Sequence, residues 1–176
     1  NYKMLLLSII SLTVGVGMNE VGATENRTTF LAVAVASTLF YIYFMEISIQ
    51  MDSLTKLLNR RCFDKHMKKL SYDTAIVLFD VNKFKSINDN YGHKQGDVVL
   101  QQVASNIRYA LGNMGYIYRI GGDEFAMILK PGQLEKMNYL LMVELLEQRL
   151  DQVRQKENPI LPSVSMGYAV YRKGMD

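Results

Sequence analysis

The sequence of 176 residues has little of several residue types, and each shortage narrows the possible functions. It has one cysteine, Cys62, and its two histidines, His66 and His93, stand far apart, so a zinc site has poor support. We expect Cys62 to pack within a helix. With only three prolines, the chain has no Pro- or Gly-rich linker between its apolar first part and its charged second part. The formal net charge is +3 and no stripe of aromatic and basic residues is present, so we expect no nucleic-acid partner.

Two long apolar stretches, residues 2–18 and 30–45, raise the hydrophobic content to 49%. About 20 helical residues cross the roughly 30 Å hydrocarbon core of a bilayer, so each stretch is near the short limit for a membrane span. Together they predict two transmembrane helices joined by the polar residues 19–29. The bilayer is therefore an expected partner.

Basic residues flank this pair of stretches on one side. Lys3 lies at the start of the first stretch, and Lys56, Arg60 and Arg61 follow the second, which predicts that the second half of the chain lies in the cytoplasm. A signal peptide is the alternative for the first stretch, but no clear cleavage site follows it. A buried helical pair is disfavoured because neither stretch has a polar face. Because the sequence begins at Asn1 without methionine, we expect a fragment of a larger membrane protein.

Acidic residues stand at the ends of apolar runs at two places in the second half. The run 75–79 predicts a buried strand that carries Asp80 at its end. The runs 116–120 and 125–129 predict a β-hairpin. The turn of this hairpin holds Gly121, Gly122, Asp123 and Glu124.

The composition of this turn predicts a metal and a phosphate. Adjacent glycines permit positive φ and remove the Cβ atoms that would block a ligand from the backbone. Carboxylate oxygens are the ligands that Mg²⁺ prefers, and substrate phosphates commonly complete its coordination. A nucleoside triphosphate is therefore the expected partner. A solvated acidic turn is the alternative when the turn is considered alone, and Asp80 disfavours it.

A longer pattern makes the prediction specific. Residues 80–97 read DVNKFKSINDNYGHKQGD and lead into a helix predicted over 98–111, while residues 52–60 read DSLTKLLNR. Together with the Gly-Gly-Asp-Glu-Phe turn and a later strand at 164–169, they resemble the GGDEF family of diguanylate cyclases. The resemblance extends from about Asp52 to Val170.

The resemblance implies a metal site. In the family, the residue that matches Asp80 binds a divalent cation through its carboxylate, and the residue that matches Val81 binds it through its backbone carbonyl. Asp123 matches the third ligand and also the acceptor of the proton from the attacking ribose hydroxyl. Glu124 is an auxiliary ligand or base, and its role relative to Asp123 stays open. The expected cofactor is Mg²⁺ or Mn²⁺.

The resemblance also implies a GTP site. Lys85 matches the residue that stabilises the transition state, with a solvated lysine as the alternative. Asn88 and Asp97 match the residues that read the guanine edge, and a carboxylate suits the N1–H and N2–H₂ donors of guanine. His93 matches a further nucleotide contact or, equally, a helix cap. The expected substrate-binding residues also include Gly121 and Gly122.

Three departures from the family pattern carry expectations of their own. Asn82 replaces an aspartate that many members have, which removes one negative charge near the metal. The Arg-x-x-Asp motif of the product-inhibition site is replaced at 112–115 by Gly-Asn-Met-Gly, so we expect no feedback there. The family's C-terminal helix with basic phosphate contacts is expected after the strand at 164–169, but the sequence stops at Asp176.

The expected fold is α+β, with an antiparallel sheet flanked by helices as in the nucleotidyl cyclase and polymerase palm. Residues 1–51 are expected to hold the two transmembrane helices and the start of a signalling helix. Residues 52–176 are expected to be the GGDEF domain without its last helix. Apolar spacing also predicts a helix over 54–70 that continues rigidly from the second span. A further helix is predicted over 133–156, with an inward face made by Leu134, Met137, Leu141, Leu145 and Leu150.

The resemblance implies that two GTP molecules condense into cyclic di-GMP with release of pyrophosphate. Because one domain is expected to hold one guanine, a homodimer is required. Two alternatives remain open: an inactive GTP-binding module that regulates a partner, and a membrane sensor or scaffold. The expected location is the inner membrane of a bacterium, with the catalytic domain in the cytoplasm.

Overall fold

The structure, a computed structural model, describes residues 9–10, 13–14, 27–48 and 50–174. The chain divides into two compact units, Asn1–Gln50 and Met51–Asp176. Each unit is described by itself.

The main described element of the first unit is helix α2 (Arg27–Ser48), 22 residues long. Within the described ranges, no helix combines the length and the apolar character that crossing a membrane requires. The second predicted span, residues 30–45, lies within α2, and its prediction as a membrane span is not supported. Most of the first predicted span, residues 2–18, lies outside the described residues.

The second unit is built on a five-stranded sheet. The strands are β1 (Leu58–Asn59), β2 (Thr74–Val81), β3 (Gly115–Arg119), β4 (Glu124–Leu129) and β5 (Val164–Tyr171). Their order in the sheet is β1-β3-β4-β2-β5. Every pair is antiparallel except β1 with β3, so the sheet is mixed and the antiparallel prediction is corrected at this edge. A two-residue strand is too short to show a period of two in the sequence.

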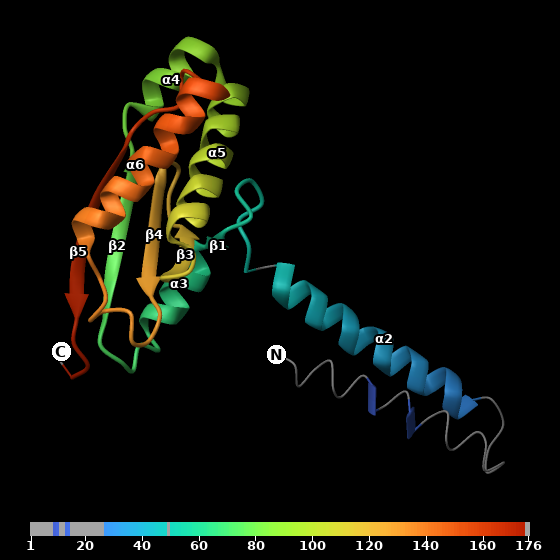
Figure 1. The fold of residues 1–176 in the computed structure, drawn as a ribbon. Coiled ribbons are helices and arrows are strands. Elements are labelled where there is room, and N and C mark those ends of the chain that lie inside the picture. The colour runs from blue at the N-terminus through green and yellow to red at the C-terminus, as the bar shows by residue number, and fades with distance from the viewer. Residues whose placement is uncertain (1–8, 11–12, 15–26, 49, 175–176) are drawn as a thin grey trace. The chain divides into compact units, whose positions relative to one another are not determined.

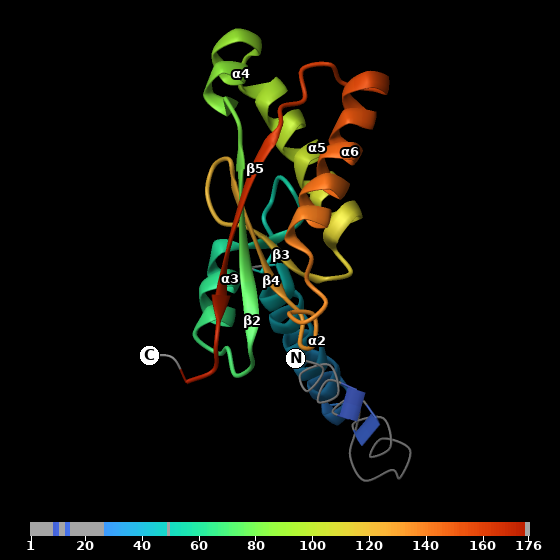
Figure 2. The same ribbon diagram turned by 60° about the vertical axis from the view of Figure 1, so that its left-hand side comes forward.

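Helices cover both faces of this sheet (Figures 1 and 2). On one face α5 (His93–Leu111) and α6 (Tyr139–Lys156) pack on the larger core. On the other face α3 (Arg60–Met67) packs on a smaller core around Cys62 and Tyr118. Cys62 is buried there, as a helix packing residue. Alternate side chains of β2 enter the larger core, namely Ala75, Val77, Phe79 and Val81.

The N-terminal helix prediction is corrected. Residues 52–57 form a turn, closed by hydrogen bonds from the Asp52 amide to the Leu57 carbonyl (2.7 Å) and from the Lys56 amide to the Asp52 carbonyl (3.0 Å). Lys56 has a φ of 56°, which a helix does not permit. Helix therefore occupies only Arg60–Met67 of the predicted range 54–70, and the side chain of Asn59 caps it.

The prediction for the last helix is also corrected. Helix α6 begins after Asn138, whose side chain accepts the Leu141 amide at 3.1 Å, and so starts six residues later than expected. This N-cap begins a helix whose buried face differs from the predicted one. The buried side chains of α6 are Met142, Leu146, Leu150 and Val153, whereas Leu141 and Leu145 are exposed.

Candidate active site

The end of β2 and the start of β4 bring two predicted acidic residues together. Asp80 lies directly opposite Glu124 in the antiparallel register, and both residues are exposed. Directly opposed residues on neighbouring strands point to the same face, with Cβ atoms about 4.5–5.5 Å apart. The partner of Asp80 on its other side is Ser165 of β5. The two carboxylates therefore share an open face at this end of the sheet.

Asp123 lies next to Val81 rather than opposite Asp80. The Val81 amide donates to the Asp123 carbonyl at 3.2 Å, so the register of the two strands continues one residue into the turn. Val81 is buried and Asp123 is partly exposed. A backbone carbonyl oxygen at this position is a ligand that a divalent cation can accept.

These oxygen atoms fit a hard divalent cation. In the part of the chain that the structure describes, no three His, Cys, Asp or Glu side chains lie close enough together to form a metal site by themselves. Mg²⁺ commonly takes one or two carboxylates and leaves its other positions to water and phosphate. The pair of Asp80 and Glu124, with the Val81 carbonyl nearby, agrees with such a site.

The two glycines of the turn matter because they lack a Cβ atom, and not because they adopt a positive φ. Neither Gly121 nor Gly122 has a positive φ, so that part of the sequence prediction is corrected. A Cβ atom on Gly121 would overlap the carboxylate of Glu124, so glycine lets this side chain fold over the turn. A Cβ atom on Gly122 would meet nothing, which leaves open space for a ligand.

Arg119 holds the turn in place, and the sequence analysis missed it. Its guanidinium donates to the Gly122 carbonyl at 2.7 and 3.2 Å and to the Asp52 carboxylate at 3.1 Å. Asp52 also accepts the amide and hydroxyl of Thr55 at 2.8 and 2.7 Å. Burial acts to raise the pKa of Asp52, but the hydrogen bonds from Thr55 and Arg119 outweigh it and hold that pKa below its ordinary value. The sequence feature that could have revealed Asp52 as a partner in this turn is the Asp-x-x-Thr pattern of Asp52 and Thr55, which is typical of a side-chain-stabilised turn.

A second group of predicted residues meets where α4 (Phe84–Tyr91) joins α5. The side-chain oxygen of Asn88 packs so tightly on Gly96 that a Cβ atom there would overlap it. Asp97 follows Gly96 in α5 and is exposed, so both predicted guanine-reading residues belong to the junction of α4 and α5. Gly96 was not singled out in the sequence. The sequence feature that could have drawn attention to it is a glycine near the start of a helix. Glycine is about 1 kcal/mol less favourable than alanine within a helix.

The remaining predicted nucleotide contacts are exposed. Lys85 lies in the first turn of α4, which begins after Lys83 in the left-handed conformation (φ 56°). His93 is the first residue of α5, and Gly92 precedes it as the N-cap. Within the described ranges, no hydrogen bond from the His93 side chain caps the helix. Both side chains are accessible to a ligand from solvent.

Asn82 ties the end of β2 to β5. Its amide donates to the Ser163 hydroxyl at 2.9 Å, and its oxygen accepts from the Ser165 hydroxyl at 2.8 Å. The Asn82 backbone amide donates to the Ser163 carbonyl at 3.0 Å. Ser165 is also the cross-strand neighbour of Asp80. An amide uses both its donor and its acceptor here, whereas an ionised aspartate has no donor for Ser163.

The sequence and the fold resemble those of known proteins. Residues 49–176 match the family described as "Diguanylate cyclase, GGDEF domain". The probable diguanylate cyclase DgcI of Escherichia coli K12 is 42% identical over 102 residues, which cover 57% of this chain and 23% of DgcI. Diguanylate cyclase DosC of the same strain is 32% identical over 147 residues, which cover 76% of this chain and 32% of DosC.

A solved structure shows the same fold. The coiled coil and GGDEF domain of DgcB from Caulobacter crescentus, in complex with c-di-GMP, has a TM-score of 0.64 and 26% identity, with 85% of each chain covered. The chain spans about a quarter to a third of the length of the curated relatives DgcI and DosC. The family match covers most of the chain, and the residues at the ends of β2 and β4 follow its pattern. The chain belongs to the GGDEF family of diguanylate cyclases.

Proposed function

We propose that this protein is a diguanylate cyclase that condenses two GTP molecules into cyclic di-GMP and releases pyrophosphate. The single observation that carries the proposal is the Asp80–Glu124 pair, two exposed carboxylates opposed across β2 and β4 beside an open glycine turn. Membership of the GGDEF family supports the same reaction. In each of two steps, the 3′-hydroxyl of one GTP attacks the α-phosphorus of another.

The Asp80 carboxylate, the Val81 carbonyl and the Asp123 carboxylate would hold Mg²⁺ or Mn²⁺, with Glu124, which lies opposite Asp80, as an auxiliary ligand. When bound, such a cation neutralises the charge of the triphosphate and favours departure of pyrophosphate. Asp123 would accept the proton of the attacking hydroxyl, because it belongs to the same turn and its side chain is partly exposed. Lys85 would place an ammonium group near the charge that develops as the phosphorus–oxygen bond breaks.

The junction of α4 and α5 would select guanine. The Asp97 carboxylate would accept the N1–H and N2–H₂ groups of the base, and the Asn88 amide would meet the remaining acceptors. Adenine lacks this pair of donors. His93, at the exposed start of α5, would add a contact to the nucleotide.

Activity is proposed to require a homodimer. Asn88 and Asp97 form one guanine site in each chain, whereas the reaction joins two nucleotides. Two domains must therefore face each other with one GTP bound to each.

The test is product formation by the full-length protein incubated with GTP and Mg²⁺. The wild type should make cyclic di-GMP, and Asp123→Asn should reduce its rate by about 100-fold or more while GTP still binds, as expected for loss of a general base. Circular dichroism checks that the variant is folded. Undiminished product formation by Asp123→Asn rejects the assignment. GTP binding by a wild type that releases no pyrophosphate favours the alternative of a regulatory GTP-binding module.

Location at the cytoplasmic side of a bacterial inner membrane stays a prediction from the sequence. GTP is found in the cytoplasm, which agrees with the proposed substrate. Fractionation of cells that express the full-length protein is the test. Recovery of the protein from the soluble fraction alone contradicts the membrane location.

A further inference from the structure

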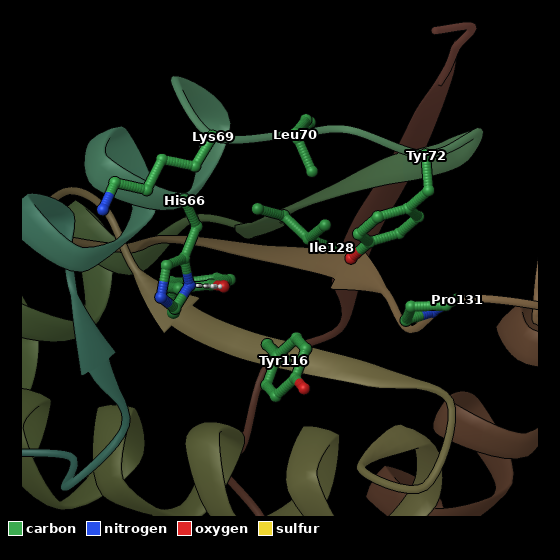
Figure 3. Close-up of a pocket in the computed structure, with 8 residues that line it drawn as sticks. His66, Lys69, Leu70, Tyr72, Tyr116, Ile128 and Pro131 are labelled. Carbon is green, nitrogen blue, oxygen red and sulfur yellow. Dashed lines mark hydrogen bonds between the residues drawn. The ribbon is translucent and has the colours of Figure 1, made fainter. Parts of the chain in front are cut away.

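A cavity of about 430 Å³ lies on the α3 face of the sheet. Figure 3 shows side chains from the end of α3 and from the sheet around it. Its lining residues are His66, Lys69, Leu70, Tyr72, Tyr116, Tyr118, Ile128 and Pro131. Small-molecule pockets typically have volumes of roughly 300–1,000 Å³, so this cavity has room for a ligand of one or two rings.

The cavity is separate from the candidate active site. Tyr116 and Ile128 are cross-strand partners near the ends of β3 and β4 that are farthest from the Gly121–Asp123 turn. None of the residues proposed to bind GTP or metal lines the cavity. Its occupant would therefore leave the GTP site accessible.

The walls of the cavity are aromatic and apolar. Tyr116 is 45% exposed, and its ring centroid lies 6.1 Å from that of His66. Figure 3 shows Tyr72 and Pro131 beside Ile128, on the other side of the cavity from His66. Aromatic side chains bind planar rings by stacking or edge contacts. The walls therefore favour a flat aromatic ligand over a flexible polar one.

The polar groups of the cavity are mainly donors. His66 Nδ1 lies 2.6 Å from the hydroxyl of Tyr118. Burial raises the pKa of Tyr118, so this buried hydroxyl keeps its proton and can donate a hydrogen bond to Nδ1. In the tautomer that accepts this bond, a neutral His66 carries its own proton on Nε2, for which no acceptor exists among the described residues. The ring thus offers a hydrogen bond to a ligand acceptor.

The charges around the cavity are positive. Lys69 lines it, and its ammonium group lies on the same side as the His66 ring in Figure 3. Within the described ranges, neither aspartate nor glutamate lines the cavity. The neighbouring surface of α3 adds further basic side chains, namely Arg60, Arg61, Lys65 and Lys68, with Asp64 as its one acid. An anionic group on a ligand would therefore be attracted to this end of the cavity.

We propose that this cavity binds a small aromatic anion, with one or two rings packed among Tyr72, Tyr116 and Pro131. The anionic group would accept hydrogen bonds from His66 Nε2 and from the Lys69 ammonium. This site goes beyond the proposed reaction and does not depend on it.

The test is titration of the full-length protein with indole-3-carboxylate, followed by NMR. Each of two control compounds keeps one feature of this ligand. Indole-3-carboxamide keeps the rings without the charge, and inorganic phosphate keeps a negative charge without the rings. The carboxylate should shift the resonances of His66 and Tyr116 with a Kd at or below about 1 mM, a typical weak small-molecule affinity. The carboxamide should bind about fivefold more weakly or worse, as expected for loss of one charged hydrogen bond. Phosphate alone should cause no shift at these residues.

Two exposed positions supply variants that should fold. Lys69→Gln should weaken carboxylate binding about fivefold, because it removes one charged donor. Lys68→Gln is the matched control, since Lys68 is exposed on the same segment and does not line the cavity. It should weaken binding by less than about twofold, because it removes only a distant, solvent-screened charge. The absence of any shift in the wild type overturns the site, and so does equal binding of the carboxylate and the carboxamide. The wild-type titrations decide the matter even where a variant fails to fold.

Discussion

At the scale of single residues, Arg119 links the start of the second unit to the catalytic turn. It makes two hydrogen bonds to the Gly122 carbonyl and one to Asp52, and its side chain is only 15% exposed. Lysine keeps the charge but lacks the planar fork that makes these bonds together. Arg119→Lys should therefore reduce the rate of cyclic di-GMP formation about tenfold or more, because a small misplacement of catalytic groups is costly.

The same substitution should lower the free energy of unfolding by about 1–2 kcal/mol, since a partly buried hydrogen bond is lost. Denaturant unfolding and steady-state kinetics measure the two effects. Arg172→Lys is the matched control, because Arg172 pairs with Asp73 at an exposed site on the rim. It should change neither quantity. A wild-type rate in Arg119→Lys would show that the turn keeps its geometry without this arginine.

His66 should make stability depend on pH. Burial and the charges of Lys65 and Lys69 lower the pKa of His66 below its ordinary value of 6.5, while Nδ1 shares a hydrogen bond with the Tyr118 hydroxyl and Tyr116 packs beside the ring. The unfolded chain therefore binds a proton more readily than the folded one. The contribution of His66 is present above pH 6.5 and is lost as the pH falls through the lowered value.

The measurement is the urea midpoint at pH 7 and pH 5 for the wild type and His66→Gln. The variant should lose less stability than the wild type between these two values, because glutamine does not titrate. Lys68→Gln, on the exposed side of the same segment, should keep the wild-type difference. Equal losses in His66→Gln and the wild type would mean that protonation of this ring does not affect folding.

At the scale of elements, the junction of α4 and α5 depends on glycine. A methyl group at residue 96 would overlap the side-chain oxygen of Asn88. Gly96→Ala should gain helix propensity yet displace Asn88, and the KM for GTP should rise about tenfold, the equivalent of one lost hydrogen bond. Gly167→Ala on β5 is the control, because a Cβ atom there meets nothing. A KM unchanged in Gly96→Ala would remove Asn88 from the guanine site.

Local pattern predicted the elements that carry the acids. The apolar runs at 75–79 and 125–129 became β2 and β4, because buried strands next to short turns have a direct signature in sequence. Their register, which sets Asp80 against Glu124 and leaves Asp123 beside Val81, comes from pairing across the sheet. No single strand encodes that pairing.

The errors have equally local causes. The apolar residues of 54–70 are spaced as in a helix, but they belong in turn to a loop, to β1 and to α3, which face two different cores. The N-cap at Asn138 makes α6 begin six residues after its predicted start at residue 133. Arg119 and Gly96 escaped notice because their partners, Asp52 and Asn88, come from other segments. Contacts between segments are a property of the fold, which a pass along the chain does not reveal.

At the scale of the whole molecule, the second unit holds both buried cores and all five strands that the described residues form. It should therefore fold without the first unit. A fragment of residues 51–176 should unfold cooperatively in urea, as single domains of this size usually do. Far-ultraviolet circular dichroism and tyrosine fluorescence should give coincident transitions. Separate transitions, or a gradual loss of signal, would show that residues 1–50 contribute to the core.

The requirement for two chains makes a further prediction about the full-length protein. If each chain holds one GTP at Asn88 and Asp97, the rate of cyclic di-GMP formation per chain should fall on dilution, because the dimer dissociates. An excess of Asp123→Asn should also suppress the wild type, since a mixed dimer has only one competent base and cannot close both phosphodiester bonds. An equal mass of an unrelated protein is the control and should have no effect. A rate per chain that stays constant across dilution and is indifferent to the variant would mean that one domain carries both nucleotides, and the guanine site would then have to be sought elsewhere in the chain.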